Sequence, residues 1–538
     1  MKKTWVILAA GIVVIVGLFS FFGQKSSEPV QDKAANAPSA TGNANANAEP
    51  TNQPKAGGVL TVGLGKEPGN PNPVIATIST GQFVKEVAYE SLLTEDEEGR
   101  LQPLLAESWE VSPDAKDITL RLRKGVKFHN GKEMQADDVV WSANHVKDPQ
   151  NAAGGQNLIK DVQVIEKIDD YTVKFKLANP SITFLNHLAN IIMLPIIPAN
   201  SLQPGQIKLE PNKFVPGTGA FKFEKFDSGS EVIATKFPDY WGSPAYLDQI
   251  TFRSIPDAST RFNALRTGGV HMADRLATLD VQRVQKGDVK DITILEEPTG
   301  GFQHVLMNYS RPLLQKREMR QALNLAIDKE QLVEEVFFGS SKATDLMMPP
   351  ESIWAKAANL PPHKRDIEKT KQLLQTANYR GEELVLIGVK NKTQLLESYQ
   401  RMLGEAGIRS KVEVLETGVM NERVRQGQYD LYIDGANINT DPFITMVPDY
   451  YTNKVEPSRY SNPVIDRLFD QLDDETDEKK RLDIFKELAA ILDEDVANIP
   501  LFFEARFIGM STKVQNYGPP QNLPYSESAH YFKQTWLK

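Results

Sequence analysis

The side chains that most often catalyse reactions or bind metals are scattered along this chain. Its seven histidines show no H-E-x-x-H spacing, and no two lie three or four residues apart, as metal ligands on one helix would. No G-x-S-x-G nucleophile motif occurs, and Gly63-Leu64-Gly65 and Gly217-Thr218-Gly219 lack the further glycines of a phosphate-binding loop. We therefore expect no catalytic residue, no metal site and no cofactor.

A polar loop over residues 435–442 (GANINTDP) is the strongest candidate for ligand binding. Asn437, Asn439 and Asp441 can donate and accept hydrogen bonds to a polar solute. The same residue types also make ordinary turns, so a turn without a ligand is the alternative. The aromatic pairs Tyr240-Trp241 and Tyr450-Tyr451 can stack against a ligand, although large aromatic side chains more often pack in a core.

The elements before this loop predict where it lies. Strand patterns over 383–387, 411–415 and 429–433 alternate with helical patterns over 393–405 and 421–426. A β-α-β-α-β order implies a mainly parallel sheet with right-handed crossovers, and ligands of such sheets bind outside the carboxyl ends of the strands. The loop follows the last strand directly, so we expect it to line a cleft.

The composition excludes several classes of protein. The chain has 538 residues, a formal net charge of −9 and no cysteine. A nucleic-acid binder normally carries a basic surplus, so we expect no nucleic acid among its partners. Without cysteine there is no disulfide, thiolate metal site or cysteine nucleophile.

The N-terminus predicts export. Within residues 1–23, two lysines precede the 19 uncharged residues Trp5 to Gly23, enough to span a bilayer as an uncleaved anchor, while a cleavable signal peptide is the alternative. Residues 24–56 have one large apolar residue, Val30, and no aromatic residue, which predicts a disordered linker. The folded body is expected to begin at Gly57.

Several segments of this body, taken together and in order, resemble family 5 of the extracellular solute-binding proteins, which includes the dipeptide-, oligopeptide- and nickel-binding proteins of ABC importers. The segments are Pro103-Leu104-Leu105-Ala106-Glu107-Ser108-Trp109, Leu122 to Gly131, Gly217-Thr218-Gly219-Ala220-Phe221, Pro238-Asp239-Tyr240-Trp241 and Arg320 to Asp328. The resemblance covers nearly the whole exported body.

The resemblance implies an α/β, two-lobed, periplasmic-binding-protein-like (Venus flytrap) fold with an extra subdomain in the first lobe. The implied divisions are lobe I at 57–303 with a subdomain at about 98–213, lobe II at 304–505, and a return to lobe I at 506–538. It also implies closure of the lobes about a hinge when ligand binds, and docking on an ABC permease driven by a cytoplasmic ATPase. The expected location is the extracytoplasmic face of the cell membrane.

Two departures from the family bear on the ligand and the anchor. Gram-positive relatives are usually lipoproteins attached through a cysteine, which this chain lacks. In the peptide binders an Asp in the loop matching 435–442 pairs with the ligand's α-amino group, whereas here the matching position falls at Ile438 or Asn439. Asp434 or Asp441 would then have to replace it, since a buried ammonium needs a carboxylate.

A second ligand-facing segment of the dipeptide binders matches Ser79-Thr80-Gly81. The first hypothesis is therefore a membrane-tethered receptor for peptide or a peptide-like small polar solute. The second is the same role for a metal chelate, an opine, a sugar or another nutrient. The third, an exported hydrolase, lacks any supporting motif.

Overall fold

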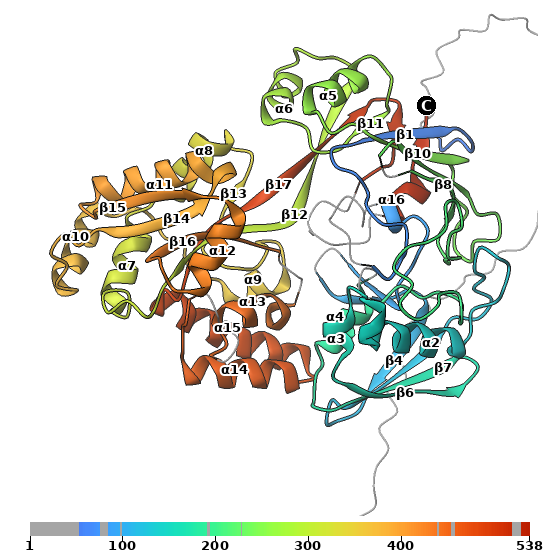
Figure 1. The fold of residues 1–538 in the computed structure, drawn as a ribbon, viewed down its shortest axis with the longest axis horizontal. Helices are drawn as coiled ribbons and strands as arrows, with labels where there is room; N and C mark the ends of the chain where they lie inside the picture. Colours follow the sequence, from blue (N-terminus) through green and yellow to red (C-terminus); the bar gives the residue numbers. More distant parts are fainter. Residues whose placement is uncertain are drawn as a thin grey trace, which may run out of the picture. The chain divides into compact units, whose positions relative to one another are not determined.

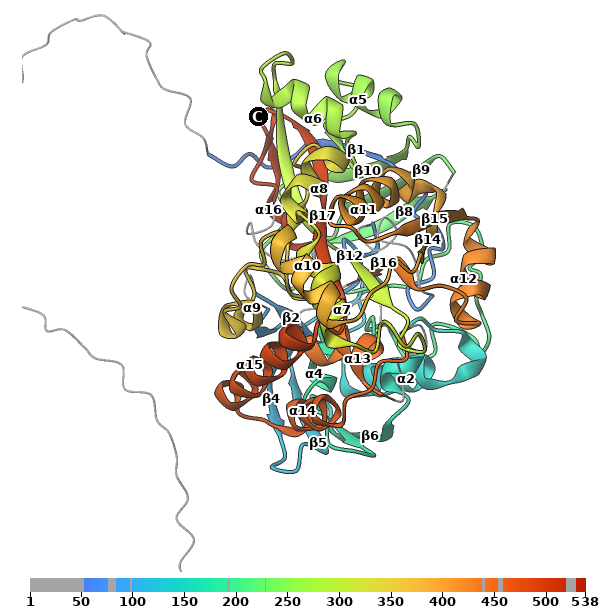
Figure 2. The same ribbon diagram turned by 90° about the vertical axis from the view of Figure 1, so that its left-hand side faces the viewer.

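The computed structural model describes most of the chain beyond the N-terminal segment (Figures 1 and 2). The described residues are 53–75, 84–96, 99–190, 194–227, 229–437, 441–452, 458–518 and 529–538. The predicted anchor and most of the predicted linker lie outside them. Residues 54–538 form one compact unit.

One eleven-stranded sheet runs through this unit, in the order β15-β14-β16-β12-β17-β11-β1-β10-β9-β8, with β13 paired to β17. β12 (Ile292–Met307) and β17 (Ile499–Ser511) are long, antiparallel strands at its centre. Figure 1 shows them running side by side from β16 and β14 to β11 and β1. The other strands of this sheet are β1 (Val59–Leu64), β8 (Phe221–Phe226), β9 (Glu231–Lys236), β10 (Gln249–Ser254), β11 (Met272–Ala273), β13 (Lys342–Ala343), β14 (Leu384–Val389), β15 (Ser410–Leu415) and β16 (Leu431–Asn437).

A separate four-stranded sheet has the order β4-β5-β7-β6. Its strands are β4 (Ala106–Val111), β5 (Asp117–Leu122), β6 (Val162–Asp169) and β7 (Thr172–Leu177). Every second residue of β5 is buried, as the alternating sequence predicts. The elements around this sheet are β2 (Leu93–Glu95), β3 (Leu101–Pro103), α2 (Ala136–Lys147), η1 (Pro149–Asn151), α3 (Gln156–Ile159) and α4 (Phe184–Leu188).

The predicted β-α-β-α-β unit is present, and its strands are parallel. β14 pairs in parallel with both β15 and β16. Leu386 and Ile433 face one hydrophobic cluster, while Ile387 and Tyr432 face another. The first cluster is completed by α7 (Arg317–Leu325), α8 (Lys329–Phe337), α10 (Ile367–Thr376) and α11 (Thr393–Glu405), and the second by α12 (Thr417–Arg425). Figure 2 shows α7, α8, α10 and α11 on one face of the strands. Successive side chains of these strands thus alternate between two hydrophobic clusters, as expected for a sheet covered on both faces.

The helices after β10 account for the remaining layers. They are α5 (Ala258–Arg266), α6 (Thr278–Gln285), α7 (Arg317–Leu325), α8 (Lys329–Phe337), α9 (Ile353–Ala358), α10 (Ile367–Thr376), α11 (Thr393–Glu405), α12 (Thr417–Arg425), α13 (Pro442–Tyr450), α14 (Pro463–Asp474), α15 (Glu478–Asp495) and α16 (Ala529–Gln534), with η2 at Lys390–Lys392 and the short strands β18 (Val514–Gln515) and β19 (Trp536–Leu537). None of the helices within the described ranges is long and apolar enough to cross a membrane.

The structure corrects one boundary of the sequence prediction. The first three residues of the expected loop at 435–442 belong to a strand, because β16 continues to Asn437 by pairing with β12, with Asn437 opposite Gly301. α13 then begins at Pro442, with Asp441 as its N-cap. Residues 438–440 lie outside the described residues.

Candidate functional site

The carboxyl ends of β14 and β16 bring together a group of polar and charged side chains, which we call the strand-end cluster. Its members are Gln303, Lys392, Asp434, Gly435 and Glu504. The parallel pairing of β14 and β16 puts both strand ends at one edge, where open α/β sheets bind their ligands. β12 and β17 pair alongside β16 and supply Gln303 and Glu504.

Asp434 is held by local hydrogen bonds on β16. Its Oδ1 accepts from the Tyr432 hydroxyl at 2.6 Å and from the Gly435 N–H at 2.8 Å. Its backbone lies opposite His304 in the register between β16 and β12. These bonds fix the orientation of the carboxylate through its Oδ1.

Lys392 ends the short turn η2 between β14 and α11. Its Nζ donates to the carbonyl oxygen of Ile433 at 3.1 Å. Burial lowers the pKa of Lys392 below its ordinary value, while the negative charges of Asp434 and Glu504 oppose this shift. An ammonium with two donors left after one backbone contact can bind an anionic group.

Gly435 allows these side chains to approach the strand. A Cβ at this position would lie 2.7 Å from the Gln303 Nε2 and 3.4 Å from the Lys392 Nζ. The Gln303 amide is fixed in turn, because its Nε2 donates to the Glu504 Oε1 at 2.8 Å. A side chain at position 435 would therefore displace the end of the Gln303 side chain.

A second polar group lies next to the cluster and is largely buried. His304 is 0% exposed, and its Nδ1 lies 2.9 Å from the Asn498 Nδ2 and 3.7 Å from the Asp449 Oδ2. Burial lowers the pKa of His304 to about 4, with the charge of Asp434 opposing the shift. Burial also raises the pKa of Asp449 to about 7, and the charge of Asp434 adds to this rise. His304 is therefore neutral at pH 7.

Asp441, one of the predicted ligand-binding residues, has two structural partners. Its Oδ1 accepts from the N–H of Phe443 at 2.8 Å, which caps α13, and its Oδ2 lies 2.8 Å from the Arg481 Nη2. The side chains of Asp441 and Arg481 are 1% and 11% exposed. The carboxylate is thus already neutralised inside the protein, and a ligand contact stays a prediction.

The remaining predicted site residues are placed only in part. Ser79, Thr80, Gly81 and Asn439 lie outside the described residues, and Asn437 is described by its backbone alone, at the end of β16. The structure thus brings Asp434 and Asn437 onto one strand end and places Asp441 in a buried ion pair. Gln303, Lys392 and Glu504 were not predicted. Only Lys392 had a sequence signal, because it directly follows a strand of the parallel unit.

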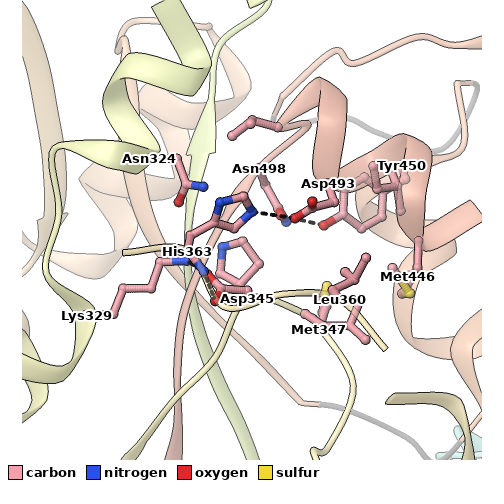
Figure 3. A pocket seen from close by; sticks show the side chains of 15 residues that line it. Asn324, Lys329, Asp345, Met347, Leu360, His363, Met446, Tyr450, Asp493 and Asn498 are labelled. Atoms are coloured by element: carbon pink, nitrogen blue, oxygen red, sulfur yellow. Dashed lines mark hydrogen bonds and ion pairs between the residues drawn. The ribbon is translucent and has the colours of Figure 1, made fainter. Parts of the chain in front are cut away.

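A separate small pocket lies beside α8, α13 and α15 (Figure 3). It contains about 20 Å³ of free space, which suits about one water molecule and is far below a ligand site of roughly 300 Å³ or more. His363 Nε2 lies 2.6 Å from Asp493 Oδ1 at its wall, and Lys329 pairs with Asp345. Among the described residues, no three His, Asp or Glu side chains group as ligands for a metal ion.

Comparisons with known proteins agree on one protein family. The sequence model for the bacterial extracellular solute-binding proteins, family 5, matches residues 100–457. A probable di/tripeptide-binding protein of Pseudomonas aeruginosa (strain UCBPP-PA14) is 28% identical over 457 residues, covering 78% of this chain and 85% of that protein. The glutathione-binding protein GsiB of Escherichia coli (strain K12) is 28% identical over 450 residues, covering 80% and 86%.

Among solved structures, the binding protein AgaA of A. tumefaciens R10, in complex with agropinic acid, superposes with a TM-score of 0.68 at 25% sequence identity. The match covers 89% of this chain and 99% of that one. Fold and sequence together define an extracytoplasmic solute-binding protein of the kind that serves ABC importers, with the two-lobed α/β architecture predicted. The chain belongs to the bacterial extracellular solute-binding proteins of family 5. Members of this family are binding proteins rather than enzymes.

Proposed function

We propose that this protein captures a peptide or a peptide-like zwitterion and that the strand-end cluster is part of its binding site. The observation that carries the proposal is the presence of an ammonium and two carboxylates at the carboxyl ends of β14 and β16. Lys392 suits a ligand carboxylate, while Asp434 and Glu504 suit a ligand ammonium. Such a pair of opposite charges recognises both ends of a short peptide.

The relatives support this ligand class, since one is described as a di/tripeptide-binding protein and another as a glutathione-binding protein. A second candidate is a non-peptide solute, such as an opine, a metal chelate or a sugar. Two observations favour it: the structural neighbour AgaA holds agropinic acid, and neither Ile438 nor Asn439 supplies the acid expected in a peptide binder.

We further propose that the lobes divide as the sequence predicts, at 57–303 with 506–538, and at 304–505, and that they close about β12 and β17. Separate hydrophobic clusters support this division. One is built from residues 60–272 with 508–532, whereas two others lie between residues 302 and 503. The two long strands are the covalent connections between these cores, which is where a hinge has to lie.

The proposal includes a membrane tether and an ABC permease as partner. Residues 1–23 hold the protein at the extracytoplasmic face, and residues 24–56 give the body a reach on the order of 30 Å. The supporting observation is the long uncharged N-terminal stretch in a chain without a cysteine for a lipid anchor. Closure on the ligand would present both lobes to the permease.

The test is thermal unfolding of residues 57–538 against dipeptides, oligopeptides, opines, metal chelates and oligosaccharides, followed by calorimetric titration of any compound that raises Tm. A ligand at 100 times its Kd adds about 2.7 kcal/mol. We expect dipeptides to raise Tm, and Lys392→Ala and Asp434→Asn each to weaken their binding roughly tenfold or more, as loss of a charge-assisted hydrogen bond does.

Lys390→Ala is the matched control, because Lys390 is an exposed lysine of the same turn η2. It should leave the affinity unchanged. If Lys390→Ala and Lys392→Ala reduce affinity equally, the cluster is not the binding site. If only a non-peptide class raises Tm, the second candidate replaces the first.

A further inference from the structure

We propose that the C-terminal end of α14 and the segment before α4 form a latch that favours lobe closure independently of the ligand. This inference rests on the proposed division into two lobes, because residues 181–184 belong to lobe I and Asp473 to lobe II. The contact joins residues about 290 positions apart, outside β12 and β17. Both helices are labelled in Figure 1.

Three hydrogen bonds build the latch. The Ser181 hydroxyl donates to the Asp473 Oδ1 at 2.8 Å, and the Thr183 N–H donates to the same oxygen at 3.3 Å. The Ile182 N–H donates to the Asp473 carbonyl oxygen at 2.9 Å. α4 has no side-chain cap of its own, so the carboxylate of α14 supplies an acceptor at its N-terminus.

One feature of the same contact opposes closure. Burial raises the pKa of Asp473 to about 6, against the hydrogen bonds from Thr183 and Ser181, and the nearby charge of Asp441 adds to the rise. The three bonds are therefore offset by the desolvation of the carboxylate. The latch biases the lobes toward closure but does not lock them.

A latch and a ligand contact affect ligand affinity differently. A latch changes the free energy of the closed state by the same amount whichever ligand is bound. Removing it should therefore weaken the binding of every ligand by one common factor. A variant in the strand-end cluster, by contrast, should change the ranking of ligands.

Two variants weaken the latch to different degrees. Asp473→Ala removes the acceptor and the milder Ser181→Ala removes one donor, so both should open the lobes. Glu478→Gln is the control, because Glu478 faces Arg100 at 3.9 Å across the same two lobes but both side chains are largely exposed.

The first readout needs no ligand. The chain has no cysteine, so Lys213→Cys and Glu368→Cys, at exposed side chains, give a uniquely labelled pair for an inter-lobe distance measurement by pulsed electron paramagnetic resonance. We expect the short-distance population to fall in Asp473→Ala, to fall less in Ser181→Ala and to stay constant in Glu478→Gln. Equal populations in all three variants would overturn the latch.

The second readout is affinity for two chemically different ligands found in the thermal screen. We expect Asp473→Ala to raise Kd about five- to tenfold for both. A loss confined to one ligand would make Asp473 a binding residue and overturn the latch. If no compound in the screen binds, the proposed ligand class fails, but the distance measurement still decides about the latch.

Discussion

The ion pair between Asp441 and Arg481 allows a direct test of whether this carboxylate is structural or binds ligand. Asp441→Ala removes the cap of α13, at a cost of about 1 kcal/mol. It also leaves the buried Arg481 without a counter-charge, which costs about 3–5 kcal/mol in a fully enclosed site. Arg481 is 11% exposed, donates to the Leu472 carbonyl oxygen at 3.0 Å and stacks on Trp354, so we expect the lower end, about 4 kcal/mol in total.

The expected shift in Tm follows from the size of the body. At about 2.1 cal/mol/K per residue, a unit of nearly 500 residues has an unfolding entropy of about 1 kcal/mol/K, so 4 kcal/mol lowers Tm by about 4 °C. If a lobe of roughly 200 residues unfolds separately, the shift is about twice as large. Scanning calorimetry of the ligand-free protein measures it directly.

A double-mutant cycle measures the interaction between Asp441 and Arg481. Asp441→Asn keeps a good N-cap residue but removes the charge, and Arg481→Met removes the other charge while keeping an apolar stem. We expect each single variant to be clearly destabilised and the double variant to lose less than the sum. An unchanged Tm in Asp441→Ala, together with lost ligand affinity, would refute the structural role and support the ligand contact predicted from sequence.

Two further predictions concern stability. Gly217→Ala should destabilise the protein by about 3 kcal/mol or more, because its Cβ would lie 1.9 Å from the backbone oxygen of Ala88. Gly404→Ala in α11 is the control, because a Cβ there meets nothing within 4 Å. In a thermal melt the control should be neutral or stabilising. The hydrogen bond to Asp493 raises the pKa of His363, so this pair should stabilise the protein at pH 5 and lose that contribution as the pH rises through the raised pKa. His363→Gln should therefore lower Tm more at pH 5 than at pH 8, and an equal effect at both would contradict the assignment.

The parallel β-α-β-α-β unit was predictable because its signals are local. Each strand and helix shows its own hydrophobic period, and the predicted helix 393–405 matches α11 at both ends. The end of β16 was not predictable in the same way. Gly435 and Asn437 are poor strand formers, and they extend the strand only because β12, more than 130 residues earlier, pairs with them.

The candidate site likewise contains residues whose roles could be predicted from sequence and residues whose roles could not. The sequence of Asp441 and Pro442 is typical of a helix N-cap followed by proline at the first helical position, so the structural role of Asp441 could have been found. Gln303 and Glu504 could not, since only the antiparallel pairing of β12 with β17 brings them together. The spacing of charged residues along the chain does not indicate that contact.

The charge state of Lys392 would link the proposed site to the proposed closure of the lobes. Burial already lowers its pKa, which means that the ammonium is incompletely compensated by Asp434 and Glu504. A ligand carboxylate beside Nζ would supply the missing negative charge and raise that pKa again, and this gain becomes larger as the lobes exclude water. A ligand without an anionic group would leave the desolvation of Lys392 uncompensated on closure. If the strand-end cluster is the binding site, it should favour zwitterions over neutral solutes in the closed state, while the proposed latch at Asp473 would set how far that state is populated before any ligand arrives.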